Sequence, residues 1–125
     1  MKTVLVVEDE PDFAKIVKRI LEPEGFAVHW SESAELGWQA LQSQGCDLAI
    51  LDWNLPGMSG IDLCRRIRED TRFKGLAVAL LTVRNTSEEQ IQGLKDSGAD
   101  LYLTKPIKPD EFLARIQSLV GLFER

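Results

Sequence analysis

Five polar residues stand at the ends of hydrophobic runs that are spread over almost the whole chain. They are Glu8 and Asp9 after the first run, Asp52 at the end of the third, Thr82 at the end of the fourth and Lys105 after the fifth. Three carboxylates held close together repel one another, and a hard divalent cation such as Mg²⁺ relieves that repulsion through oxygen ligands. A carboxylate nucleophile, a metal ion, an ammonium and a hydroxyl are the groups that phosphoryl transfer requires. The set therefore indicates phosphoryl-transfer chemistry, with Asp52 as the candidate reacting group.

The segments between these residues predict the elements that position them. Strands are expected at 3–7, 26–31, 47–52, 76–82 and within 100–106, and the first, third and fourth of these are continuously apolar or β-branched. A helix is expected after each strand, because apolar residues recur there at i, i+3 and i+4. Pro11 suits the first turn of the first helix and Gly60 opens the third. The fourth helix, Ser87–Ser97, has the weakest pattern and contains Gly93.

Five such β-α units in succession predict a doubly wound three-layer sandwich. Strands that are apolar along their whole length imply burial on both faces, so we expect a parallel sheet between two layers of helices. In sheets of this kind the functional crevice lies at the carboxyl ends of the strands. The five polar residues are therefore expected to meet at one edge of the sheet.

Composition limits the classes of protein to which the chain can belong. The 125 residues, 44% of them hydrophobic, suit one domain, residues 1–125, with a core that needs no disulfide or metal. A net charge of −5 argues against direct binding to nucleic acid and against a basic membrane-surface protein. Cys46 and Cys64 form no metal-binding pair and fit a reducing cytosol. We therefore expect a cytoplasmic protein without a membrane segment.

Four motifs, in order and at matching spacing, resemble those of the receiver domains of two-component response regulators. They are the acidic pair in VLVVEDE, the phosphoacceptor loop DWNLPGMSG, the strand ending LLT and the lysine–proline pair in GADLYLTKP. The resemblance spans nearly the whole chain and implies a flavodoxin-like (βα)5 fold with strand order 2-1-3-4-5. It also implies that Asp52 accepts a phosphoryl group from a sensor histidine kinase, a phosphotransfer protein or a small phosphodonor.

The same resemblance implies a Mg²⁺ site and no other cofactor. Asp9 would bind the metal directly and Glu8 mainly through water. Asp52 and the backbone carbonyl of Asn54 would be the remaining protein ligands. Glu8 stands where this family more often has aspartate, which lengthens that side chain by one methylene.

The resemblance further implies a switch. Thr82 and Lys105 would bind the phosphoryl group, and Tyr102 would change rotamer as Thr82 moves. The change would alter a face made of the fourth helix, the fifth strand and the fifth helix, through which a homodimer is possible. The Lys105–Pro106 bond would be cis. Such a domain catalyses its own phosphorylation and dephosphorylation but is not a conventional enzyme.

Three further positions bear on these expectations. Val83 follows Thr82 where the family usually has a small residue, so its branched side chain is expected to crowd the site and slow small phosphodonors. Leu101 stands where many DNA-binding regulators have a second aspartate, which weakens the case for their salt-bridged dimer. Trp53 follows the candidate nucleophile in a loop and is expected to be partly exposed.

Other classes of protein fit the sequence less well. A phosphorylation-independent interaction or dimerisation module would not need the intact set of five polar residues. A flavodoxin-like cofactor binder would need a Ser-, Thr- or Gly-rich loop after the first strand, whereas EDEPDF repels anions. A dehalogenase-type phosphatase would need a second acid two residues after its nucleophile, where Asn54 stands.

Overall fold

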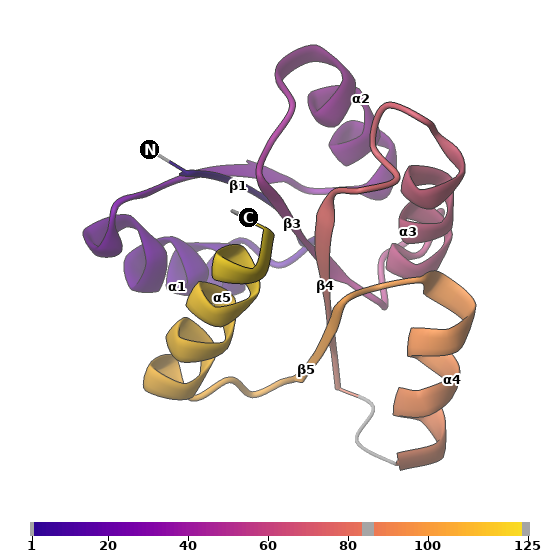
Figure 1. The fold of residues 1–125 in the computed structure, drawn as a ribbon. Coiled ribbons are helices and arrows are strands. Elements are labelled where there is room, and N and C mark those ends of the chain that lie inside the picture. The colour runs from indigo at the N-terminus through magenta and orange to yellow at the C-terminus, as the bar shows by residue number, and fades with distance from the viewer. Residues whose placement is uncertain (1, 84–86, 124–125) are drawn as a thin grey trace.

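The sheet in the computed structural model has five parallel strands in the order β2-β1-β3-β4-β5, which confirms the predicted topology (Figure 1). The structure describes residues 2–83 and 87–123. The strands are β1 (Lys2–Val7), β2 (Phe26–Ser31), β3 (Leu48–Asp52), β4 (Ala77–Thr82) and β5 (Leu101–Thr104). The helices are α1 (Pro11–Leu21), α2 (Ala34–Gln44), α3 (Gly60–Glu69), α4 (Ser87–Ser97) and α5 (Pro109–Phe123), with a 3₁₀ turn, η1, at Glu22–Glu24.

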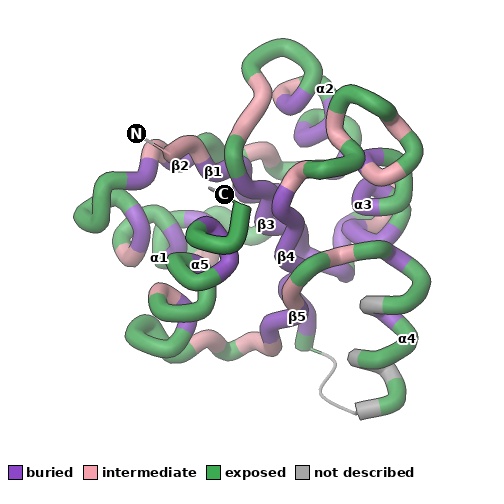
Figure 2. Tube along the Cα trace, in the orientation of Figure 1, coloured by how far each residue is buried: buried purple, intermediate pink, exposed green. Residues whose placement is uncertain are grey.

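Two layers of helices enclose the sheet. Helices α1 and α5 cover one face, and α2, α3 and α4 cover the other (Figure 1). Along β1, Val4 and Val6 pack toward α1 and α5, whereas Leu5 and Val7 pack toward α2 and α3. Every residue of β3 is buried, and Figure 2 shows the strands as the buried centre of the molecule. Burial of both faces is the reason that β3 and β4 are continuously apolar up to their last residue and do not alternate with polar residues.

Helix α3 begins directly against the end of β3. Its first residue is Gly60, whose N–H donates a hydrogen bond to the Trp53 carbonyl oxygen at 3.1 Å. A Cβ at this position would overlap the Asp52 carbonyl oxygen and lie 2.8 Å from the carbonyl carbon of the same residue. Ser59 caps the helix by accepting a hydrogen bond from the Asp62 N–H at 3.1 Å. The missing side chain at position 60 therefore lets α3 start in contact with the strand that ends at Asp52.

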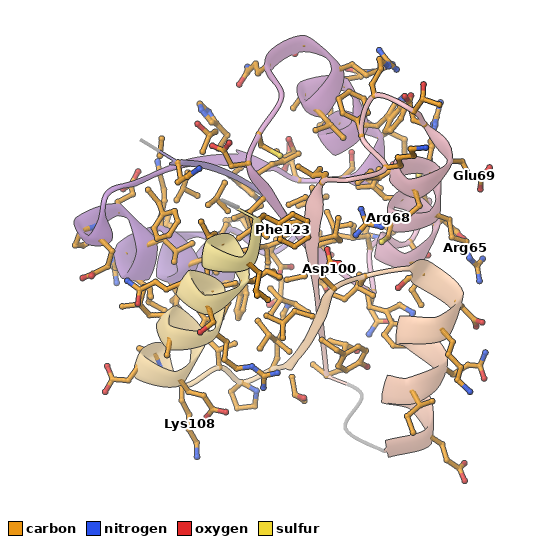
Figure 3. All side chains as sticks on the ribbon, viewed as in Figure 1. Arg65, Arg68, Glu69, Asp100, Lys108 and Phe123 are labelled. Carbon is orange, nitrogen blue, oxygen red and sulfur yellow. The ribbon has the colours of Figure 1, made fainter. Side chains whose placement is uncertain are left out.

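Arg68 in α3 fastens the start of β4 to the connection between α4 and β5. Its guanidinium donates to the carbonyl oxygens of Lys74, Leu76 and Gly98 at 3.1, 2.6 and 2.8 Å. It also donates to Asp100 Oδ2 at 2.8 Å, and the same oxygen accepts the Val78 N–H at 2.9 Å. Figure 3 shows Arg68 and Asp100 close together, whereas Arg65 and Glu69 point outward from α3. One side chain thus joins three segments of the fold.

Candidate functional site

The carboxyl ends of four strands bring predicted site residues to one edge of the sheet. Asp52 is the last residue of β3 and Thr82 the last of β4, while Glu8 follows β1 and Lys105 follows β5. Thr82 pairs in register with Thr104, and the Lys105 N–H donates to the Thr82 carbonyl oxygen at 2.7 Å. Backbone pairing therefore fixes where the side chains of β4 and β5 leave the sheet. The Lys105–Pro106 peptide bond is cis, as the resemblance implies.

Lys105 lies between two buried carboxylates. Glu8 is fully buried and Asp52 is 4% exposed. The Lys105 ammonium nitrogen is 2.5 Å from Glu8 Oε1 and 3.3 Å from Asp52 Oδ2, and the lysine side chain is only 10% exposed. Burying a charge is costly unless it is paired and hydrogen-bonded. The ammonium therefore compensates both carboxylates at this edge of the sheet.

Burial and charge shift the pKa values of Glu8 and Lys105. Burial raises the pKa of Glu8 from 4.5 to about 7; the hydrogen bond from Lys105 opposes this rise, and the nearby Asp52 carboxylate adds to it. Burial lowers the pKa of Lys105, but the hydrogen bond to Glu8 and the charge of Asp52 outweigh it, so the net shift is upward. Lys105 thus stays charged near neutral pH, where Glu8 exchanges a proton.

The raised pKa of Glu8 makes the stability of the metal-free protein depend on pH. Below pH 4.5 the carboxyl is protonated in both the folded and the unfolded chain, so its contribution to stability is fully present. Between pH 4.5 and about 7 the unfolded chain releases this proton and the folded one keeps it. The contribution therefore falls as pH rises, by on the order of 3 kcal/mol across the window. Urea unfolding in EDTA, measured for wild type and Glu8→Gln at several pH values, tests this prediction. Parallel pH profiles of the unfolding free energy in the two proteins would contradict it.

Acidic side chains converge at the end of β1. One carboxylate oxygen from each of Glu8, Asp9 and Glu10 lies within 4.8 Å of the others, with Glu8 buried and the other two exposed. The Glu10 N–H donates to Glu8 Oε2 at 3.2 Å, and the Trp30 indole N–H donates to the Glu8 carbonyl oxygen at 2.7 Å. Hard oxygen donors held this close fit a divalent cation such as Mg²⁺. Glu10 was not anticipated from the sequence, although its position directly after the acidic pair was a visible signal.

The phosphoacceptor candidate is oriented by its own loop. The Asn54 N–H donates to Asp52 Oδ1 at 3.2 Å, while Lys105 contacts Oδ2. Each carboxylate oxygen of Asp52 thus has a defined donor. The predicted role of the Asn54 carbonyl as a metal ligand stays a prediction. Val83, next to the buried Thr82, is 62% exposed, and its predicted effect on access to the site also stays a prediction.

Trp53 is buried, so the expectation of partial exposure is wrong. The side chain is 9% exposed and lies edge-to-face against Tyr102, with ring centroids 5.7 Å apart and planes at 88°. Helix α4 packs on this pair through Gly93, where a Cβ would lie 2.6 Å from the Trp53 ring and 3.1 Å from the Tyr102 ring. The predicted switch residue Tyr102 is itself 8% exposed. The residue after Asp52, the candidate switch and α4 are therefore in direct contact.

Among the described residues, none of the helices has the length and apolar character needed to cross a membrane.

Comparison with known proteins gives consistent matches over nearly the whole chain. Residues 4–117 match the sequence model of the response regulator receiver domain. The chain is 42% identical over 118 residues to response regulator RppA of Synechocystis sp., covering 93% of this chain and 49% of RppA. It is 39% identical over 117 residues to the phosphate regulon transcriptional regulatory protein PhoB of Rhizobium meliloti, covering 94% of this chain and 51% of PhoB. The chain thus spans about half the length of these curated relatives.

A solved structure agrees with the fold. The signal receiver domain of a signal transduction histidine kinase from Syntrophus aciditrophicus superposes with a TM-score of 0.92 at 29% sequence identity. The superposition covers 100% of this chain and 94% of that one.

Proposed function

Because the chain belongs to the response regulator receiver domain family, we propose that it is a phosphorylation-dependent switch that accepts a phosphoryl group on Asp52. Domains of this family are signalling domains of two-component systems, interact with histidine kinases or phosphotransfer proteins, and typically bind Mg²⁺ at an acidic pocket. The proposal treats residues 1–125 as one receiver domain. The observation that carries it is the Lys105 ammonium held between Glu8 and Asp52, residues brought together from distant parts of the chain.

Asp52 is the proposed nucleophile. A carboxylate oxygen attacks the phosphorus of a phosphohistidine; an O–P bond forms as the P–N bond breaks, and the imidazole nitrogen leaves with the electron pair. With a small donor such as acetyl phosphate, a P–O bond breaks instead and acetate leaves. Attack by water on the acyl phosphate restores the carboxylate and releases inorganic phosphate, and we include this slow reversal in the proposal.

The neighbouring side chains bind and orient the transferred group. Lys105 supplies a positive charge for a phosphoryl oxygen, and the buried Thr82 supplies a hydroxyl at the end of the adjacent strand. Glu8, Asp9, Asp52 and the Asn54 carbonyl are the proposed residues that hold Mg²⁺, with Glu10 beside them. When bound, the metal would offset negative charge on the phosphoryl group.

The structural change caused by phosphorylation is proposed to pass through the aromatic pair Trp53 and Tyr102. Thr82 moves toward the phosphoryl group, and Tyr102, which pairs with Leu80 one strand away, adjusts against Trp53. Because Gly93 lets α4 rest on both rings, a rearrangement of either ring repositions α4. The readout is a changed face of α4, β5 and α5, available to a partner protein or a second copy of the chain.

A homodimer through the face of α4, β5 and α5 is a separate part of the proposal. Leu101 replaces the second aspartate of many DNA-binding relatives and packs against the core. Solution mass measured with and without beryllofluoride, a phosphoryl mimic, decides it: doubling of the mass with the mimic supports a phosphorylation-driven dimer.

Asp52→Asn is the direct test of the switch. Wild-type protein incubated with phosphoramidate and Mg²⁺ is expected to gain one phosphoryl group by intact mass, and the variant is expected to gain none, because an amide cannot attack phosphorus. Asp62→Asn is the matched control, since this aspartate lies on α3 with its side chain 57% exposed and outside the site. Equal labelling of Asp52→Asn and wild type overturns the assignment. Labelling of neither supports a phosphorylation-independent interaction module.

A further inference from the structure

Besides the carboxylates of Glu8, Glu10 and Asp52, the Lys105 ammonium has a neighbour that carries no charge. Its nitrogen lies 4.2 Å from the centroid of the Phe13 ring, in the first turns of α1. Ammonium groups over an aromatic face are attracted by the ring quadrupole, and the attraction grows when both groups are desolvated. The lysine side chain is only 10% exposed and the Phe13 ring is partly buried, so the contact is largely shielded from water.

The ring is held in place from behind. Phe13 is partly buried and packs against the core cluster on the α1 and α5 side of the sheet, which includes Val17 and Phe112. Lysine has a long flexible stem, and fixing it in one place costs rotamer entropy. A rigid aromatic face next to the site lowers the further ordering that Lys105 needs when it binds a phosphoryl oxygen.

The other contacts of Lys105 depend on the state of the site. Glu8 lies in the cluster of carboxylates that fits a divalent cation, and Asp52 is a proposed ligand of the same ion. Glu10 is 3.8 Å from the ammonium with a side chain 70% exposed, so water screens that pair. A phenyl ring does not compete for a hard cation. Among the contacts described for Lys105, the Phe13 face is therefore the one that persists when the carboxylates are engaged elsewhere.

We propose that Phe13 is a positioning residue that keeps the Lys105 ammonium at the edge of the sheet, ready to bind the transferred phosphoryl group. The inference rests on the proposed function, since Lys105 acts on the phosphoryl group. The geometry of the contact itself is independent of that function. Phe13 does not touch the reacting atoms and acts only through Lys105.

Two measurements test the proposal. In metal-free protein, the Hε and Cε resonances of Lys105 are expected to show an upfield ring-current shift that disappears in Phe13→Leu and persists in Phe13→Tyr. With Mg²⁺ and phosphoramidate, the phosphorylation rate constant is expected to fall about 10-fold in Phe13→Leu and to stay within about two-fold of wild type in Phe13→Tyr. Phe73→Leu is the matched control, because its ring faces Arg72 at 4.8 Å on the other side of the sheet and its loss should leave both readings unchanged.

The two measurements test the contact between Phe13 and Lys105 separately from the positioning role of Phe13. Unchanged Lys105 resonances in Phe13→Leu overturn the contact, and shifted resonances with an unchanged rate overturn the positioning role. If Phe13→Leu does not fold, Phe13→Met removes the ring while keeping a long apolar side chain. A ring-current shift in a wild-type protein that cannot be phosphorylated would overturn the proposed function and the role of Phe13 in it, but not the contact.

Discussion

Replacing Gly60 with alanine is expected to destabilise the domain by about 3 kcal/mol or more, an unusually large effect for one added methyl group. The new Cβ would overlap the carbonyl oxygen of Asp52 and lie 3.2 Å from the Cα of Trp53. Both are backbone atoms in a buried strand end, so neither can rotate away as a flexible side chain would. Relief requires α3 or the end of β3 to move, and Asp52 would move with them.

Gly121→Ala provides a control of opposite sign. This glycine lies in α5, and a Cβ there would have no atom within 4 Å. Alanine has the higher helix propensity, so this variant is expected to gain about 0.5–1 kcal/mol. Urea unfolding followed by circular dichroism measures both changes. A Gly60→Ala variant as stable as wild type, with normal phosphorylation of Asp52, would show that β3 and α3 are not in the close contact described above.

Arg68→Ala is expected to cost about 2–3 kcal/mol of unfolding free energy, the second large effect. The substitution leaves three carbonyl oxygens and the Asp100 carboxylate without the donor that joins them. The arginine side chain is 20% exposed, so water replaces its hydrogen bonds only in part. Arg68→Lys should recover little, because one ammonium cannot reproduce the planar fork that reaches acceptors both before β4 and between α4 and β5.

Arg65→Ala is the control that distinguishes the several hydrogen bonds of Arg68 from the effect of an ordinary surface arginine. Arg65 lies on the same helix and donates to the Asp96 carbonyl oxygen at 2.7 Å, but its side chain is 47% exposed. Its loss is expected to cost less than about 1 kcal/mol. Chemical unfolding of both variants at one pH gives the comparison, and equal costs would mean that Arg68 contributes no more than a surface arginine.

The fold was predictable because its main signal is local and repeated. β3, β4 and most of β1 are short apolar runs, and a parallel sheet covered on both faces is the arrangement that buries such runs. Because the carboxyl ends of parallel strands meet at one edge, the strand assignments alone predict that Glu8, Asp52, Thr82 and Lys105 lie together. The close pairing of Lys105 with Glu8 and Asp52 follows from that placement and from opposite charge.

The contacts that could not be predicted from the sequence depend on how the helices pack against the sheet. From the sequence, Phe13 is only one of the apolar residues of α1, and its position over Lys105 follows from the placement of that helix against the sheet. Trp53 was expected to be partly exposed because it follows a strand, but α4 covers it. Gly93 was noted only as a weak point in its helix, whereas its lack of a side chain is what permits this cover.

The contact of Gly93 with Trp53 and Tyr102 has a thermodynamic consequence that runs in both directions. Trp53 is bonded directly to the candidate phosphoacceptor, so any free energy that a modification of Asp52 spends on moving α4 is coupled to whatever binds α4. Linkage requires the coupling to be reciprocal: a protein that binds one position of α4 more tightly must change the equilibrium affinity at Asp52 by the same factor. The affinity of the domain for beryllofluoride, measured with and without such a protein, would give that factor. Under the proposed switch, a partner that distinguishes the positions of α4 is therefore also an effector of the chemistry at Asp52.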